Sequence, residues 1–278
     1  MTLVEKLARP RPLIMGILNV TPDSFSDGGA FLDADKAVEH GLRMAAEGAD
    51  IIDVGGESTR PGALRVGVGD QVNRTRQIVE RLRAVLPPAV TVSIDTTLPE
   101  VAEAALGAGA GLINDISGGG DPGMLELAAA RKIPIVLMHM QGTPATMQQN
   151  PIYVDVVAEV ETFLIAAARA ALKAGVGRDR ILIDPGIGFG KAGVHNLALM
   201  AGLSRLAAHG WPVLLGTSRK RFMGSICNET QPRDLLGATC ATTAMGVAAG
   251  VRVFRVHDVK ANRQAADVAW AICHEHGP

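Results

Sequence analysis

The sequence sets chemically capable side chains at regular intervals, each directly after a short apolar run. These carboxylates, amides and cations are Asn19, Asp53 with Glu57, Asp95, Asn114 with Asp115, His139, Asp184, Ser218 to Lys220, and Arg255 with His257. Any one of them alone is most simply a cap on a strand or on the next helix. Eight such positions in one chain predict a ring of polar groups above an apolar barrel, which describes a binding pocket.

The ring divides into two chemical groups. The first group offers hydrogen-bond acceptors and one amide, and consists of Asp95, Asn114 and Asp184. It suits a flat heterocycle that carries N–H donors. The second group is cationic or can become so, and consists of Lys220, Arg255 and His257. It follows the last two strands, where barrels frequently bind phosphate. The pocket is therefore predicted to have a hydrogen-bonding end and an anion-binding end.

Alternating short apolar runs and helical segments must position these residues. Strands are expected at 13–18, 51–54, 90–94, 112–113, 135–138, 181–183, 213–215 and 251–254. Helices are expected at 34–48, 71–85, 99–108, 122–131, 154–174, 196–209, 233–250 and 259–274. This alternation predicts an α/β protein, a single-domain (β/α)₈ TIM barrel over residues 12–278, with residues 1–11 as an N-terminal extension. The main alternative is an open doubly wound sheet, but the first turn, TPDSFSDGG, lacks that fold's glycine-rich signature.

The segment DPGIGFGK at 184–191 has two interpretations. Its glycines beside a lysine suggest a phosphate cradle, but the spacing of a nucleotide-binding loop is absent. The favoured interpretation is that the glycines let the backbone pass close to a ligand or a neighbouring strand.

Composition excludes several classes of function. The net charge of −1 offers no basic excess for nucleic acid, and there is no polybasic stretch for a membrane surface. No uncharged apolar run is long enough for a membrane span. The three cysteines, Cys227, Cys240 and Cys273, show no disulfide or zinc spacing, which favours a reducing cytoplasm. The sequence His274-Glu275-His276 resembles a metal motif but is interpreted as a chain end.

Several long motifs, in order along the chain, resemble the dihydropteroate synthase family. They are MGILNVTPDSFSDGG at 15–29, DVGGESTRPGA at 53–63, SIDT at 93–96, INDISG at 113–118, LMHMQGTPATMQ at 137–148, DPGIGFGK at 184–191, GTSRKRFMG at 216–224 and RVHDV at 255–259. The resemblance implies a transferase of folate biosynthesis that joins (7,8-dihydropterin-6-yl)methyl diphosphate to 4-aminobenzoate and releases diphosphate. It also implies a Mg²⁺ ion, a homodimer and inhibition by sulfonamides.

The resemblance assigns roles to individual residues. It places the pterin at Asp95, Asn114, Asp184 and Lys220, and the diphosphate at Asn19, Arg255 and His257, with Asn19 also touching the metal. Lys220, Arg255 and His257 are the catalytic candidates. The 4-aminobenzoate site is expected to involve Phe25, Thr59, Arg60, Pro61 and Ser218, with Phe189 as a further substrate contact. The loop at 21–29 is interpreted as a lid over this second substrate.

The chemistry fits that assignment. An aniline nitrogen is uncharged at neutral pH and needs no strong general base, so a dissociative substitution is expected, with diphosphate leaving early. One alternative is a methyltetrahydrofolate-dependent methyltransferase, which shares the pterin end but has no diphosphate to neutralise. The other is a non-catalytic pterin-binding paralogue, which would be expected to lack one or more of the site residues.

Overall fold

The structure is a computed structural model that describes residues 1–20, 30–57 and 66–274. Its strands are β1 (Leu13–Asn19), β2 (Ile51–Gly55), β3 (Thr91–Asp95), β4 (Leu112–Asp115), β5 (Ile135–Met138), β6 (Ile181–Asp184), β7 (Leu214–Leu215) and β8 (Val253–Val256). Its helices are α1 (Leu3–Leu7), α2 (Ala30–Ala46), α3 (Val68–Val85), α4 (Pro99–Gly107), α5 (Pro122–Arg131), α6 (Val156–Lys173), α7 (Gly193–Ala201), α8 (Leu203–Ala207), α9 (Arg221–Cys227), α10 (Leu236–Ala248) and α11 (Val259–His274). Within these residues no helix is long and apolar enough to cross a membrane.

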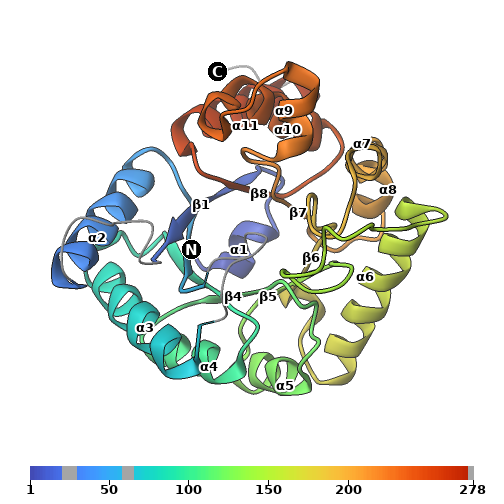
Figure 1. Cartoon of the computed structure of the whole chain (residues 1–278). Coiled ribbons are helices and arrows are strands. Elements are labelled where there is room, and N and C mark those ends of the chain that lie inside the picture. Colours follow the sequence, from blue (N-terminus) through green and yellow to red (C-terminus); the bar gives the residue numbers. More distant parts are fainter. Residues whose placement is uncertain (21–29, 58–65, 275–278) are drawn as a thin grey trace.

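The strands close into a barrel. All the paired strands are parallel, and their order is β6-β5-β4-β3-β2-β1-β8-β7. A further parallel bridge between Ile183 and Val213 joins the two ends of this order. Figure 1 looks along the barrel, with the larger helices as an outer ring. The predicted (β/α)₈ barrel is therefore confirmed.

Alternation along the strands separates two apolar clusters, because successive side chains point to opposite faces. Outward-facing residues such as Ile52, Ile94 and Phe254 pack in the large cluster that includes the helices. Inward-facing residues form a second cluster at the N-terminal ends of the strands: Met15, Ile51, Leu112, Val136, Leu182, Leu214 and Val253. The inside of the barrel is thus a packed apolar layer at this end.

Helix α1 closes the apolar end of the barrel. A capping box starts this helix, since the Thr2 hydroxyl accepts from the Glu5 N–H and the Glu5 carboxylate accepts from the Thr2 N–H. Its side chains Leu3 and Leu7 belong to the inner apolar cluster. Part of the segment expected to be an extension therefore completes the barrel core.

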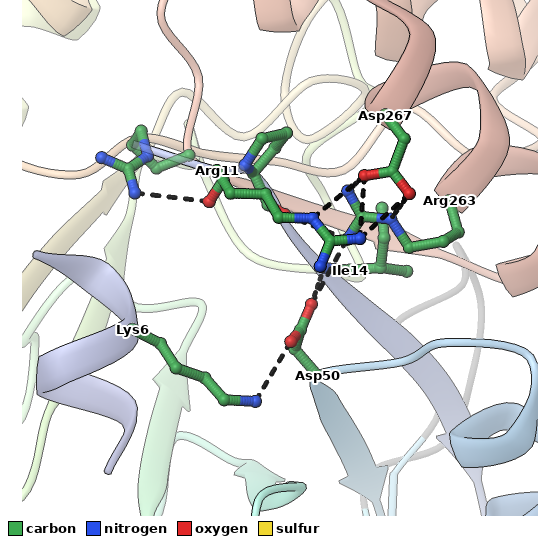
Figure 2. A network of polar contacts seen from close by, with 8 residues as sticks. Lys6, Arg11, Ile14, Asp50, Arg263 and Asp267 are labelled. Atoms are coloured by element: carbon green, nitrogen blue, oxygen red, sulfur yellow. Dashed lines mark hydrogen bonds and ion pairs between the residues drawn. The ribbon is translucent and has the colours of Figure 1, made fainter. Parts of the chain in front are cut away.

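A polar network fastens this end of the chain to the barrel (Figure 2). The Asp50 carboxylate accepts from Lys6 Nζ at 3.1 Å, from the Ile14 N–H at 3.1 Å and from Arg263 Nη1 at 3.4 Å. The Asp267 carboxylate accepts from Arg263 at 2.7 Å and from Arg11 at 3.0 Å. The segment before β1 is therefore held by the start of β2 and by α11.

Three helical features differ from the expectation. The sequence predicts one helix at 196–209, but Gly202 adopts φ −90° and ψ 5° between α7 and α8. Glycine is a poor helix former, and here it separates two short helices. Helices α1 and α9 are not predicted, because five and seven residues carry too little periodic signal.

We expect Leu7→Ala to lower the free energy of unfolding by about 2 kcal/mol or more, because it opens a cavity in the inner cluster. Leu7 is 5% exposed, whereas Leu42 on α2 is 38% exposed. The control variant Leu42→Ala should therefore cost less than about 1 kcal/mol. Urea denaturation of the two variants measures both values, and equal losses would contradict the role given to α1.

Candidate active site

A polar layer lies above the inner apolar cluster. It begins two residues further along the strands that supply Ile51, Leu112, Leu182 and Val253, which brings Asp53, Asn114, Asp184 and Arg255 to the same face of the sheet. Because the strands are parallel, these residues meet at the C-terminal end of the barrel, where barrel enzymes place their active sites. The structure thus brings together the residues that the sequence placed at both ends of the pocket.

Arg255 is the centre of this layer. Its Nε donates to Asp53 Oδ2 at 2.7 Å, and its Nη2 donates to Asp95 Oδ2 at 2.7 Å. Asn114 Nδ2 donates to the same Asp53 oxygen at 3.0 Å. Residues from β2, β3, β4 and β8 are therefore joined across the barrel by one guanidinium and two carboxylates.

Burial sets the charge state of this cluster. It raises the pKa of Asp95 to about 7, an effect that Arg255 opposes and Asp53 strengthens. Burial alone would lower the pKa of Arg255, but Asp53 and Asp95 outweigh it and keep that pKa above its usual value. Arg255 therefore stays charged, while Asp95 titrates near neutral pH.

Asp184 and Lys220 form a second pair of binding groups. Asp184 Oδ1 accepts from the Gly186 N–H at 2.7 Å, and burial raises the pKa of this carboxyl to about 6. Burial also lowers the pKa of Lys220 to about 8, with Arg255 adding to the effect. The Lys220 ammonium lies 4.1 Å from the centre of the Phe189 ring, and no carboxylate in the described ranges forms an ion pair with it. Its N–H groups are thus free for a ligand.

The glycines at 184–191 allow the close backbone approach that the sequence predicts. Gly186 has φ +64°, and a Cβ there would lie 1.9 Å from the carbonyl oxygen of His139. Gly188 has φ +82°, and a Cβ there would lie 3.0 Å from Lys220 Cδ. These two glycines let the loop pack directly against the end of β5 and the Lys220 side chain.

Lys191 holds that loop from within. Its buried Nζ contacts His139 Nδ1 at 2.9 Å and the carbonyl oxygens of Phe189 at 2.9 Å, Gly186 at 3.0 Å and His139 at 3.2 Å. Burial, with the Lys191 charge adding, lowers the pKa of His139 to about 3. Burial lowers the pKa of Lys191 to about 7, an effect that Asp184 opposes. His139 is therefore neutral, and its contact with Lys191 connects two loops.

Asn19 places an amide oxygen at the C-terminal end of β1. A Cβ on Gly55 would lie 3.5 Å from Asn19 Oδ1 and 3.7 Å from Asp95 Oδ2, so both oxygens lie beside Gly55. Amide and carboxylate oxygens are the ligands that Mg²⁺ prefers, together with water and substrate phosphate. Among the residues that the structure describes, no cluster of three or more His, Cys, Asp or Glu side chains could hold a metal. The residues therefore fit a magnesium ion that a phosphorylated substrate helps to bind.

The sequence placed four loop residues at the second substrate, and all lie outside the described residues: Phe25, Thr59, Arg60 and Pro61. Ser218, predicted for the same site, lies 2.9 Å from His257, measured from Oγ to Nδ1, and its contact with 4-aminobenzoate stays a prediction. The sequence flagged Asp53 and Lys191 but assigned neither a role. Each is a charged residue in a segment that is otherwise apolar or glycine-rich. Such a pattern identifies a candidate site residue but not its interaction partner.

The raised pKa of Asp184 predicts how stability depends on pH. A folded-state pKa above the unfolded value adds stability at low pH that disappears as the pH rises through about 6. Asparagine cannot ionise, so Asp184→Asn should gain about 1 kcal/mol relative to the unmodified chain between pH 5 and pH 8. Urea denaturation at both pH values measures this difference, and a constant offset would contradict it.

Comparison with known proteins agrees with this geometry. The pattern of the family described as "Pterin binding enzyme" matches residues 15–257. Dihydropteroate synthase of Mycobacterium leprae is 47% identical over 268 residues, covering 94% of this chain and 93% of the relative. The structure of Xanthomonas albilineans dihydropteroate synthase with 4-aminobenzoic acid superposes with a TM-score of 0.89 at 46% identity, covering 98% of this chain and 95% of that one. The Yersinia pestis enzyme, in complex with a sulfonamide drug, gives 0.88 at 42% identity, with 94% of each chain covered. The chain therefore belongs to the pterin-binding enzyme family, among the dihydropteroate synthases.

Proposed function

We propose that the chain joins (7,8-dihydropterin-6-yl)methyl diphosphate to 4-aminobenzoate, giving 7,8-dihydropteroate and diphosphate for folate biosynthesis. The observation that carries this function is the neighbourhood of Lys220 and Arg255. One polar layer contains an ammonium without a carboxylate partner, in the described part of the chain, beside carboxylates with raised pKa values. Such a layer suits a ligand with N–H donors at one end and negative charge at the other.

The pterin end is supported by acceptors with free positions. Asp184 uses Oδ1 for the Gly186 N–H, and Asp95 uses Oδ2 for Arg255. Among the described residues, this leaves one oxygen of each carboxylate for ring N–H groups. Asn114 donates through Nδ2, so its carbonyl oxygen also remains available. The Lys220 charge lowers the pKa of Asp184, so the two groups lie close together. Lys220 is expected to donate to an acceptor on the heterocycle.

The diphosphate end is supported by Arg255 and His257. Two of the donor nitrogens of Arg255, Nε and Nη2, bind carboxylates, and Nη1, which has no partner in the described part of the chain, is left to meet an anion. In the dissociative substitution, the methylene C–O bond breaks and its electron pair leaves with diphosphate. The lone pair of the 4-aminobenzoate nitrogen then forms the new C–N bond, and that nitrogen loses a proton to solvent. The cations stabilise the departing charge without any reorganisation.

Diphosphate release tests this function directly. It should require both 4-aminobenzoate and the pterin diphosphate, and omission of either should abolish it. A methyltransferase of the same barrel type would release none, and a non-catalytic paralogue would bind the pterin without turnover. The Lys220 and Arg255 charges argue against the methyltransferase, because that reaction has no diphosphate to neutralise. Sulfonamides should compete with 4-aminobenzoate in this assay.

We expect Lys220→Ala and Arg255→Ala each to lower kcat/KM about 10²- to 10³-fold, because each variant lacks a preorganised positive charge that would face the leaving group or the pterin. His274→Ala, at the exposed C-terminal end of α11, is the matched control and should be unchanged. Near-normal turnover in both active-site variants would contradict the assignment.

We also propose that Mg²⁺ binds at Asn19 Oδ1 with the substrate diphosphate. When bound, the ion neutralises charge on the leaving group. Asn19→Ala should raise the Mg²⁺ concentration needed for half-maximal rate by about tenfold, the lower range for loss of a residue that supports a metal. Titration of Mg²⁺ after chelation measures it, and an unchanged requirement would remove Asn19 from the metal site.

A homodimer is proposed on the strength of the family resemblance. It is supported by exposed apolar side chains on the neighbouring helices α6 and α7: Leu172, Val194 and Leu197. Light scattering distinguishes a mass of 29.0 kDa from twice that mass. Location in the cytoplasm stays a prediction from the cysteine pattern.

A further inference from the structure

Ser218 and His257 form a closed pair of hydrogen bonds behind the diphosphate end. The backbone N–H of His257 donates to Ser218 Oγ at 3.2 Å, and the same Oγ lies 2.9 Å from His257 Nδ1. Ser218 is 5% exposed, so its hydroxyl has little access to water. Within the described ranges, both contacts of this hydroxyl are to one residue, His257.

The donors and acceptors around the Ser218 hydroxyl determine where its proton and the His257 proton lie. The backbone N–H can only donate, so it uses a lone pair of the Ser218 oxygen. The hydroxyl hydrogen then has one described acceptor, His257 Nδ1. If Nδ1 carried the proton instead, it would donate to the oxygen, and the buried hydroxyl hydrogen would have no acceptor among the described residues, which is unfavourable. The hydroxyl therefore donates to Nδ1.

We propose that Ser218 is a positioning residue that fixes His257 as the tautomer protonated on Nε2, so that Nε2–H is a neutral donor to the leaving diphosphate. This inference rests on the proposed function for the identity of the anion. The opposite tautomer would direct a lone pair at that anion and repel it. Ser218 thus acts at the diphosphate end rather than at 4-aminobenzoate.

Charge around the ring favours a neutral histidine. Burial lowers the pKa of His257 to about 3, and Arg219, Arg255 and Lys220 add to this effect while Asp258 opposes it. A neutral imidazole has two tautomers, and the one present depends on the partner of the other nitrogen. Ser218 is that partner.

The turn that carries Ser218 is fixed from two sides. Arg219 has φ +59° and donates to the Asp258 carboxylate through Nη2 at 2.8 Å and Nε at 3.1 Å. Its backbone N–H also donates to Thr239 Oγ1 at 3.3 Å. This bidentate ion pair connects the residue after Ser218 to the residue after His257, so the hydroxyl is held at its position beside the ring.

Nitrogen-15 NMR of the unmodified protein at pH 7.5 tests the tautomer without any turnover measurement. Protonated and unprotonated ring nitrogens resonate in well-separated ranges, and the His257 signals are identified by their loss in His257→Gln. We expect a protonated Nε2 and an unprotonated Nδ1. Protonation of Nδ1, or of both nitrogens, would overturn the inference while leaving the proposed function intact. Failure of the diphosphate-release assay would instead overturn the function.

Kinetics of matched variants test the consequence. Ser218→Ala should lower kcat/KM for the pterin diphosphate about ten- to hundredfold, the range typical when the partner that orients a metal-ligating histidine is removed. The KM for 4-aminobenzoate should change less than about twofold, since only the anion donor is affected. Ser225→Ala removes an exposed hydroxyl in α9 and should leave both values unchanged. A fall confined to 4-aminobenzoate would overturn the inference.

Two amide variants of His257 test the roles of its two ring nitrogens separately. A glutamine amide reaches the position of Nε2, whereas an asparagine amide reaches that of Nδ1. His257→Gln should therefore keep at least about ten times the rate of His257→Asn. In the His257→Gln background, adding Ser218→Ala should cost less than about threefold, because no tautomer is left to select. Equal rates for the two amides, or an undiminished effect of Ser218→Ala, would contradict the inference.

Discussion

The contact of Arg255 with Asp53 and Asp95 is the interaction on which the site depends. One guanidinium is shared between two carboxylates inside the barrel, so the cluster carries more negative than positive charge. Paired charges in such a place contribute little net stability, because the cost of removing them from water offsets their attraction. Their value is geometric, because they fix Arg255 beside Asp95, a proposed acceptor for the pterin, and leave it facing the proposed position of the anion. The raised pKa of Asp95 is the electrostatic result of that arrangement.

The apolar cluster that stabilises the barrel and the polar layer of the candidate site lie at opposite ends of the strands. The N-terminal ends of the strands enclose an apolar cluster that α1 covers, and the network around Asp50 and Arg263 holds that cover in place (Figure 2). Two residues further along the same strands, the inward side chains become carboxylates, an amide and a guanidinium. The polar layer therefore rests on a packed support. Strands position Asp53, Asn114 and Arg255, whereas Lys220 comes from the turn after β7.

Most of the site was predictable because the strand ends are local features. A few residues of sequence are enough to recognise an apolar run followed by Asp184 or by Arg255. The parallel barrel then brings such strand ends together. The partners were not predictable in the same way. Arg255 and Asp53 are 202 residues apart, and Lys191 and His139 are 52 apart. Which carboxylate meets which cation depends on strand register and rotamer, and these are properties of the folded barrel. The short helix α1 escaped prediction for a related reason, since tertiary packing stabilises it more than its own sequence does.

Two histidines at strand ends, His139 and His257, bear on whether the polar layer contains a general base. Each has Nδ1 engaged, by the Lys191 ammonium in one case and the Ser218 hydroxyl in the other, and burial keeps both neutral. Neither is poised to exchange a proton near neutral pH, as a general base would be. An aniline nucleophile is uncharged at neutral pH and does not need a general base. The groups whose pKa values lie near neutral pH are instead Asp95, Asp184, Lys191 and Lys220, and all of these except Lys191 are proposed to bind the pterin. The pH dependence of the reaction should therefore follow substrate binding, and catalysis should come from the placement of charge.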